Sequence, residues 1–416
     1  MKISNSNLYK YIYALIFLPL FVRFFTDNFG MSYAVMPLFD AYAVVLLLVV
    51  FYLSKKRNSI LEFWLFVFAF SGIISIIVNG GVSFSNLFYS VRPYFRMIIA
   101  IMISALAFNI KHLEKLFKYV ETLLYVNAIV MTYQFLFQGL RQDVIGGTFG
   151  NNQGVNAIQN ILCVFVFCVT IEYYLKYIFS KKKLIINVVV IFYIAIMAEI
   201  NMVFFEAAII GAILFLLNKS KHQYISKRKL FFISGGLCGI VIGLYLFMKF
   251  NTERLFLLSL PNILEYLGFN SGNTGVYKIS RVKVFSQLGN SFFKDDLCGW
   301  LFGFGLGNCS THSSFYNIHQ NLQYTFFSSS NIFLETGLFG VFANLGVIVS
   351  TLVLSIKNRK IIYDPKQKAW MDISVAITII ILLLFFYNTT LRDTYTAFFA
   401  GMLLGIPYAI KKIQKN

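Results

Sequence analysis

Long, nearly uninterrupted apolar runs are the feature that most constrains this chain. They recur from residue 8 to residue 411, and most approach the roughly 20 residues that a helix needs to cross the hydrocarbon core of a bilayer. Apolar residues make up 58% of the 416 residues and charged residues only 13%, whereas soluble domains have about 45–50% and 25%. The sequence therefore predicts an all-α polytopic membrane protein.

The apolar runs predict about twelve transmembrane helices. Residues 184–217 count as two of them because roughly 34 residues are too many for one crossing, and the run is interrupted near Glu199 and Asn201. The first run lacks the small-residue cleavage site of a signal peptide, so it is expected to be a retained span. The predicted spans are residues 8–25, 32–54, 60–78, 88–110, 115–139, 154–178, 184–200, 202–217, 230–249, 331–356, 370–388 and 394–411.

The basic residues predict how these spans are oriented. The net charge is +19, and most of the 36 Lys and Arg residues fall in short loops between alternate spans. Cytoplasmic loops are enriched in such residues, so both termini are expected in the cytoplasm and no nucleic-acid partner is implied. Residues 1–249 would then hold helices 1–9, residues 250–330 one long periplasmic loop with short amphipathic helices, and residues 331–416 helices 10–12.

The cysteines and histidines predict no metal site and no cofactor. Three of the five cysteines lie in predicted spans, where they serve as small apolar residues. Cys298 and Cys309 lie in the long loop, where an oxidising compartment would allow a disulfide between them, and two free thiols are the alternative. The four histidines are scattered along the chain without metal-ligand spacing.

Two arginines stand out because they break the predicted charge pattern. Arg92 and Arg96, in SNLFYSVRPYFRMII, sit at the outer mouth of the fourth span. They are four residues apart and share a helical face if the helix has begun by Pro93. Either both side chains reach toward lipid phosphates, or two guanidinium groups near a helix start form an anion site that binds phosphate oxygens.

Four motifs occur in an order that resembles the bacterial O-antigen polymerase and O-antigen ligase superfamily. Tyr277 and Arg281 match an aromatic-x-x-x-Arg amphipathic helix, and Glu335 lies in a segment similar to the family's Glu-x-Gly-Leu-x-Gly motif. The matching segments are GTFGNNQGVNAI (147–158), GVYKISRVKVFSQLG (275–289), WLFGFGLGN (300–308) and NIFLETGLFGVF (331–342). The motifs cover about 120 residues, and the layout of spans and loop covers most of the chain.

The resemblance implies the C-type glycosyltransferase fold and a location in the bacterial inner membrane, with the active site on the periplasmic face. A polymerase of this kind transfers a growing glycan from undecaprenyl diphosphate to a hydroxyl of the next lipid-linked repeat unit. The implied partners are that lipid-linked glycan and membrane lipid, with a chain-length regulator as a candidate partner.

Two departures from the family pattern affect the prediction. Ligases carry a His-Asn pair about nine residues before the conserved Glu, and this chain has Phe326 and Phe327 there, which favours a polymerase. A Ser-Arg pair expected near residue 205 is replaced by Phe205 and Glu206. Another arginine is then expected to replace the missing one, with Arg92, Arg96 and Arg141 as the candidates.

The predicted catalytic residues are Arg281, Glu335 and His319. Arg281 is expected to stabilise the departing diphosphate, and either Glu335 or His319 to accept the proton of the acceptor hydroxyl. The alternative interpretations are a helix cap or ion-pair partner for Glu335 and a solvated side chain for His319. The predicted substrate-binding residues are Arg92, Arg96, Arg141, Arg254, Tyr277, Lys278 and Asn151.

Other functions stay open at this point. An O-antigen ligase is one alternative, and a flippase or transporter is another, because Asp40 and Glu206 are acids within or near spans. The sequence shows no internal repeat of the kind that transporters often have. The glycines of GFGLG lack the context of a nucleotide-binding loop and are expected to let the long loop fold tightly against the helices.

Overall fold

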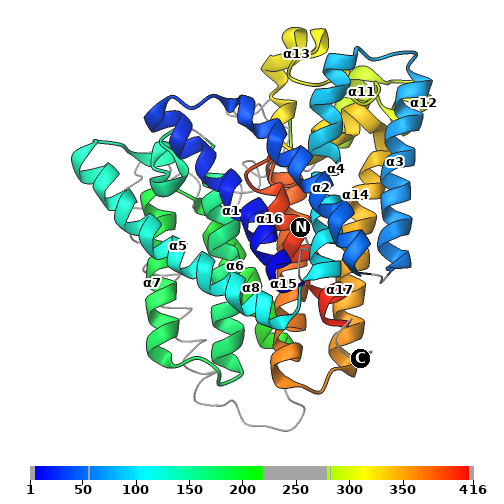
Figure 1. Ribbon diagram of the computed structural model, residues 1–416. Coiled ribbons are helices and arrows are strands. Elements are labelled where there is room, and N and C mark those ends of the chain that lie inside the picture. Colours follow the sequence, from blue (N-terminus) through cyan, green and yellow to red (C-terminus); the bar gives the residue numbers. More distant parts are fainter. Residues whose placement is uncertain (1–4, 55–56, 153, 219–278, 282, 412–416) are drawn as a thin grey trace.

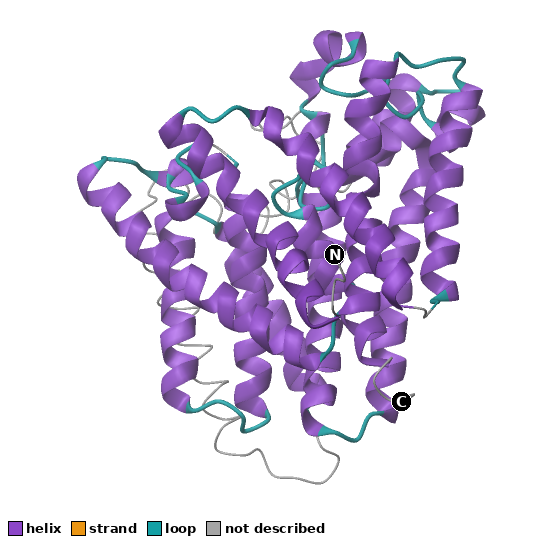
Figure 2. Cartoon of the chain, viewed as in Figure 1, coloured by secondary structure: helices purple, strands orange, loops and turns teal. Residues whose placement is uncertain are grey.

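A computed structural model describes residues 5–54, 57–152, 154–218, 279–281 and 283–411. Within these ranges all regular secondary structure is helical, and the long helices form a bundle (Figures 1 and 2). The helices are α1 (Asn5–Phe29), α2 (Met36–Ser54), α3 (Ser59–Val78), α4 (Phe84–Ala107), α5 (Ile110–Phe137), α6 (Asn156–Leu175), α7 (Lys181–Met197), α8 (Asn201–Leu217), α11 (Val284–Phe292), α12 (Leu297–Phe302), α13 (Ser314–His319), α14 (Ser328–Ile361), α15 (Pro365–Tyr387), α16 (Ala397–Leu404) and α17 (Ile406–Lys411).

Eight of the described helices are long and apolar enough to cross a membrane, which supports the predicted all-α membrane fold. They are α1 to α6, α14 and α15. The predicted division of residues 184–217 is confirmed, since α7 ends at Met197 and Glu199 adopts a positive φ of 53° before α8 begins. The predicted span 230–249 lies outside the described residues, so the total of twelve stays a prediction.

The predicted last span, 394–411, does not form one continuous helix. α16 ends at Leu404 and α17 begins at Ile406, because Pro407 lacks the N–H that would continue the helical hydrogen bonds. Every residue of α16 is buried, and the helix lies among the longer helices (Figure 1). Its contact with α4 is close, since a Cβ on Gly401 would meet that of Ala100 at 2.6 Å.

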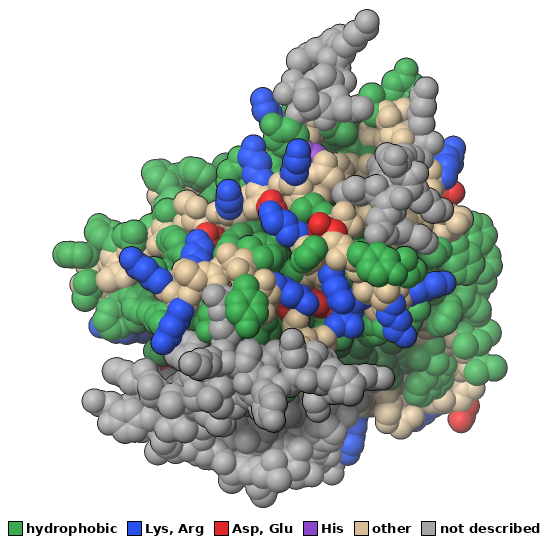
Figure 3. Space-filling model, turned by 90° about the horizontal axis from the view of Figure 1, so that it is seen from below, with side chains coloured by type: hydrophobic (Ala, Val, Ile, Leu, Met, Phe, Trp, Pro, Cys, Tyr) green, Lys and Arg blue, Asp and Glu red, His purple; other side chains and the backbone are tan. Residues whose placement is uncertain are grey.

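The two ends of the bundle differ. Figure 1 shows α11, α12 and α13 at one end, the upper end, and the α6–α7 and α14–α15 connections at the other, the lower end. Lys and Arg side chains are spread over the described part of the lower face (Figure 3). This distribution fits a cytoplasmic lower end, but the positions of the termini relative to a membrane stay a prediction.

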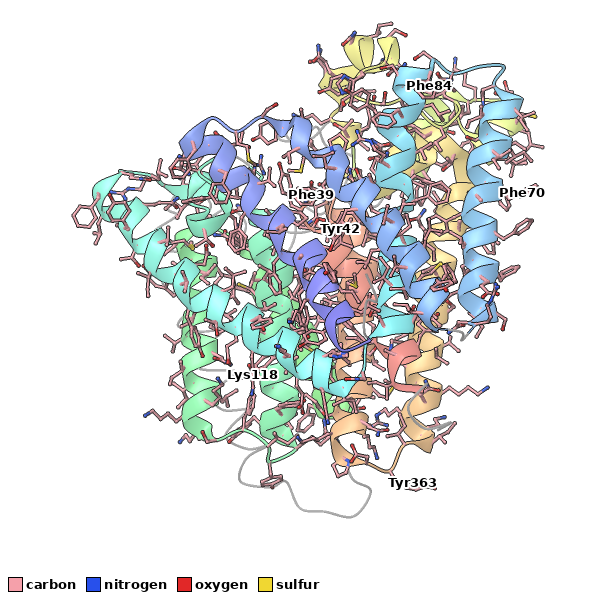
Figure 4. The ribbon with its side chains drawn as sticks, viewed as in Figure 1. Phe39, Tyr42, Phe70, Phe84, Lys118 and Tyr363 are labelled. Carbon is pink, nitrogen blue, oxygen red and sulfur yellow. The ribbon has the colours of Figure 1, made fainter. Side chains whose placement is uncertain are left out.

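α4 begins earlier than the sequence analysis expected. The Ser83 side chain accepts the N–H of Asn86 and caps a helix that starts at Phe84, so Pro93 lies inside the helix and not at its first turn. The upper end of α4, which Phe84 marks in Figure 4, therefore extends two turns beyond Arg92. Arg92 and Arg96 still share one face, but that face lies within the bundle and not at a helix N-terminus.

α14 contains a break that shapes the upper end. Gly337 has φ 62° and ψ −163°, so the helix is divided into residues 328–336 and a longer part below. The turn at Gly303 packs into this break: Phe304 N–H donates to Leu334 O at 2.7 Å, and a Cβ on Gly303 would lie 2.6 Å from the same oxygen. The expectation that these glycines let the loop fold tightly against the helices is confirmed.

Candidate functional site

Arg92 and Arg96 meet one carboxylate, that of Asp40 on α2. Arg96 Nε and Nη2 donate to the two Asp40 oxygens at 2.6 and 2.8 Å, and Arg92 Nη1 donates to one of them at 3.2 Å. Arg96 Nη1 donates to the carbonyl of Arg392 at 2.5 Å. Because Asp40 and Arg96 are buried, these arginines do not reach toward lipid, and the first interpretation of the pair is wrong.

A second ion pair joins the end of the upper part of α14 to the connection between α15 and α16. Arg392 Nη2 donates to Glu335 Oε2 at 2.9 Å, and Ser90 Oγ donates to Glu335 Oε1 at 2.5 Å. Glu335 is fully buried, and both its oxygens are engaged. The ion-pair interpretation of Glu335 is therefore confirmed, and its fully buried carboxylate already accepts one hydrogen bond at each oxygen.

Arg392 also offers an unused donor. Its side chain is about nine-tenths buried, with a side-chain exposure of 10%, yet its Nη1 has no hydrogen-bond partner among the described residues. Buried guanidinium groups normally fill their hydrogen-bonding capacity. An unsatisfied Nη1 beside a paired Nη2 is what an anion-binding group would show when no anion is present.

Arg281 lies where α14 begins and α15 ends. Its guanidinium carbon is 4.3 Å from the centre of the Tyr387 ring and 5.4 Å from that of Phe327, within range of cation–π interactions. The first turn of α14 is tied to the same place, because the Ser328 N–H and hydroxyl each donate to Asn388 O at 2.9 Å. We refer to Arg92, Arg96, Arg281 and Arg392, with Asp40 and Glu335, as the arginine centre.

α1 adds residues that the sequence analysis did not assign to the site. The Arg23 guanidinium carbon is 5.6 Å from the centre of the Tyr395 ring. Asp27, one turn further, accepts the Asn151 N–H at 2.9 Å and the Asn152 side-chain amide at 2.5 Å. Residues 151 and 152 thus bind the upper end of α1, and Asn151 takes part through its backbone.

Asp393 is a further acid whose carboxyl group interacts with Arg96 and Arg23. It lies in the connection between α15 and α16, and its side chain accepts the Tyr395 N–H at 3.4 Å. Burial raises the pKa of Asp393 above its ordinary value, although the positive charges of Arg96 and Arg23 oppose the shift. The residue as a whole is partly exposed. No periodic pattern in the sequence marks Asp393, because it lies in an irregular connection.

The structure does not join the remaining predicted residues to the arginine centre. Arg141 is exposed, lies 3.7 Å over the Phe135 ring and donates to the carbonyls of Phe135 and Leu140 at the end of α5. His319 packs between Phe292 and Phe315 at ring distances of 5.0 and 4.6 Å. Its described contacts are thus aromatic. Arg254, Tyr277 and Lys278 lie outside the described residues.

The disulfide considered for the long loop does not form. Cys298 is exposed and Cys309 is buried, and both are free thiols. Cys309 sits under Tyr324, whose hydroxyl donates to its carbonyl at 2.8 Å, while Cys298 faces outward on α12. Burial raises the pKa of the Cys309 thiol well above its ordinary value, so this thiol stays protonated.

The two acids that suggested a transporter have different surroundings. Asp40 is neutralised by Arg92 and Arg96. Glu206, fully buried on α8, accepts the Asn160 amide at 3.2 Å through Oε1, and its Oε2 has no hydrogen-bond partner among the described residues. Asp40 is therefore part of the arginine centre, and Glu206 remains a separate buried acid.

The arginine centre can hold an anion by charge and by directed donors. Arg92 and Arg96 are held in place by Asp40. The Nη1 of Arg392 has no hydrogen-bond partner among the described residues, and Arg281 lies against aromatic rings near the start of α14. Compared with known proteins, the chain matches no protein-family model, and no curated protein is significantly similar to it.

Proposed function

We propose that this protein polymerises lipid-diphosphate-linked glycan repeat units at the outer face of a bacterial inner membrane. The observation that carries the proposal is the buried guanidinium of Arg392, which pairs with Glu335 through Nη2, while its Nη1 has no hydrogen-bond partner in the described part of the chain. Arg281 adds a second guanidinium against Tyr387 and Phe327. Planar guanidinium groups suit the bidentate binding of phosphate oxygens.

The reaction would transfer the growing glycan from its lipid diphosphate to a hydroxyl of the next repeat unit. The hydroxyl oxygen forms a bond to the anomeric carbon, the bond from that carbon to the diphosphate oxygen breaks, and the lipid diphosphate leaves with the electron pair. Positive charge on Arg392 and Arg281 would stabilise the oxygen that gains charge. The main contribution of the protein is then electrostatic stabilisation together with alignment of the two substrates.

The proton of the acceptor hydroxyl needs a base. Glu335 suits this role less well, because its side chain is fully buried and each oxygen already accepts a hydrogen bond, from Ser90 or from Arg392. We assign the role to Asp393, a partly exposed residue whose carboxyl group lies near Arg96 and Arg23 and has a pKa raised by burial. A raised pKa brings a carboxylate closer to the range in which it accepts a proton effectively.

The arrangement of charges supports the orientation in this proposal. Basic side chains on the lower face favour a cytoplasmic lower end, and the upper end would then face the periplasm. Undecaprenyl-diphosphate-linked repeat units are the substrate class that the sequence resemblance suggests. The transporter alternative retains one supporting observation, the buried and partly unpaired carboxylate of Glu206.

Deleting the gene and separating the surface glycan on a gel tests the proposal. Loss of the polymer ladder, with a single repeat unit still reaching the surface, is the expected result. Retained lipid-linked polymer without surface glycan would indicate a ligase instead. Repeat units trapped on the inner leaflet would indicate a flippase.

A pair of variants tests the site itself. Arg281→Ala is expected to abolish the ladder while the protein remains in the membrane at its normal level. Arg141→Ala is the matched control, because Arg141 is an exposed arginine bonded only to nearby carbonyls in the described structure, and it should leave the ladder intact. A normal ladder from Arg281→Ala would remove this residue from the site.

A further inference from the structure

A groove of about 390 Å³ opens at the surface of the upper end, beside α12 and the part of α14 just below its break. None of its lining residues belongs to the arginine centre. The groove is lined by Lys294, Asp295, Leu297, Trp300, Leu301 and Leu338.

The backbone at Lys294 lies in the left-handed region, where a lysine is strained. α11 ends at Phe292, and Lys294 follows with a positive φ of 33°, closing the turn through its N–H to Gly289 O at 2.9 Å. Glycine is the usual residue in such a position because it adopts positive φ without strain. A lysine here places an ammonium group beside the groove, at a backbone position where glycine would be more stable.

Trp300 fixes the same segment. Its Nε1–H donates to Lys294 O at 3.2 Å, and its ring packs 5.6 Å from that of Phe333. Tryptophan with one polar and one apolar side is enriched at the boundary between the hydrocarbon core and water. Its place in the groove indicates the depth at which lipid headgroups lie.

The apolar side of the groove continues into a surface suited to lipid chains. Leu301 and Leu338 are partly exposed, and Phe70 on α3 points away from the bundle in Figure 4. The Phe70 ring packs against Phe339 at 5.7 Å and so joins α3 to α14. Further exposed apolar side chains on these two helices are Ile73, Ile77, Phe342, Val349 and Val353.

The charges of the groove select among headgroups. Lys294 presents a cation and Asp295 an anion side by side. A headgroup with only negative charge would be attracted by Lys294 and repelled by Asp295. A headgroup with a phosphate and a primary ammonium matches both, because the ammonium N–H groups can donate to the carboxylate. A quaternary ammonium has no N–H to donate.

We propose that this groove binds one phospholipid whose headgroup carries a phosphate and a primary ammonium, with Lys294 at the phosphate and Asp295 at the ammonium. The acyl chains then lie along the apolar surface of α3 and α14. This assignment is independent of the proposed glycan chemistry, since it involves none of the residues of the arginine centre.

Native mass spectrometry of the purified full chain with competing lipids tests the assignment. Equal amounts of phosphatidylethanolamine, phosphatidylglycerol and phosphatidylcholine are added, and the bound lipid is counted. The wild type is expected to retain the ethanolamine lipid roughly tenfold better than either competitor, as two charge-assisted contacts would allow. Equal retention of the three lipids, or a preference for the glycerol lipid, overturns the proposal without any variant.

Two variants separate binding from folding. Lys294→Gly should lose the preference while its melting temperature stays equal or rises, because glycine accepts the positive φ. Asp295→Asn should bind ethanolamine and choline lipids equally. Lys283→Ala is the matched control, an exposed lysine at the opposite end of α11 and outside the groove, and it should keep the full preference. An unchanged preference in both groove variants refutes the site.

Discussion

Two groups of buried charges lie toward opposite ends of the described bundle, and they differ in how completely the charges are paired. At the lower end, Lys176 lies 3.5 Å from Glu172 and 3.4 Å from Asp372, and Arg359 pairs with Asp372 and with the carbonyl of Leu217. Both acids are fully buried, and two cations balance two anions. This group joins α6, α8, α14 and α15 and leaves no cation without a carboxylate.

The upper end is organised differently. There, Arg92 and Arg96 pair with Asp40, and Arg392 pairs with Glu335, so three cations face two carboxylates. One of these arginines, Arg392, keeps a buried Nη1 without a partner among the described residues. The comparison suggests that balanced buried pairs serve the assembly of helices, whereas the unbalanced group has capacity left for a ligand.

The largest expected effect is on the balanced group. Asp372→Ala leaves Arg359 and Lys176 without their shared partner, and removing one member of a buried ion pair costs about 3–5 kcal/mol. We expect a strongly lowered melting temperature in detergent and little folded protein in the membrane. An unchanged melting temperature would mean that the lower group does not hold the helices together.

The second prediction concerns the unbalanced group. Arg392→Lys keeps the positive charge beside Glu335 but loses the planar pair of donors, so polymer yield should fall roughly 10²–10³-fold with nearly normal protein levels. The polymer ladder and the amount of membrane-bound protein are measured together. Arg141→Lys is the control and should change neither. A full ladder from Arg392→Lys would reduce Arg392 to a structural partner of Glu335.

A smaller effect is expected from Asp393 and depends on pH. Because burial raises its pKa, the folded protein binds this proton more tightly than the unfolded chain does. The corresponding stabilisation is complete below the unfolded pKa of about 3.9 and is lost as the pH rises through the folded value. Asp393→Asn should therefore melt at a higher temperature than wild type at pH 7, with the difference shrinking toward pH 4. A difference that grows toward acid pH contradicts the sign of this shift.

The smallest effect is expected from an exposed pair at the lower end. Lys366 Nζ lies 3.2 Å from Glu114 Oε1, with more than half of the lysine side chain exposed. Such pairs contribute about 0–1 kcal/mol, so Lys366→Ala should barely shift the melting temperature. A decrease in melting temperature as large as that of Asp372→Ala would show that solvent exposure does not determine how much an ion pair stabilises this protein.

The sequence predicted what local patterns determine. Apolar runs predicted the long helices, and the i, i+4 spacing correctly placed Arg92 and Arg96 on one face. The sequence pattern could not show that this face packs toward Asp40, which lies 52 positions before Arg92 in the chain. That pairing depends on how α2 and α4 pack together. The start of α4 at Phe84 was also not predicted, because the apolar run that predicts this span begins only at residue 88.

The candidate site was predictable only in part. Glu335 and Arg281 were singled out through motifs, while Arg392 and Asp393 stand in an irregular connection where neither period 3.6 nor flanking residues signal a role. Their importance comes from the fold, which sets that connection against α4 and α14. The considered disulfide failed for a similar reason, because sequence proximity of Cys298 and Cys309 says nothing about which of them is buried.

The position of α16 has a consequence for how the molecule is made. Its partner on α4 is synthesised long before it, since the hydrogen bond from Ser104 to Met402 O spans 298 residues. The place that α16 fills must therefore stay vacant in the membrane, or be held by lipid or an insertion factor, while the intervening helices emerge from the ribosome. Small side chains on α4, such as Ala100 and Ser104, allow α16 to pack against it late in synthesis without displacing neighbouring helices.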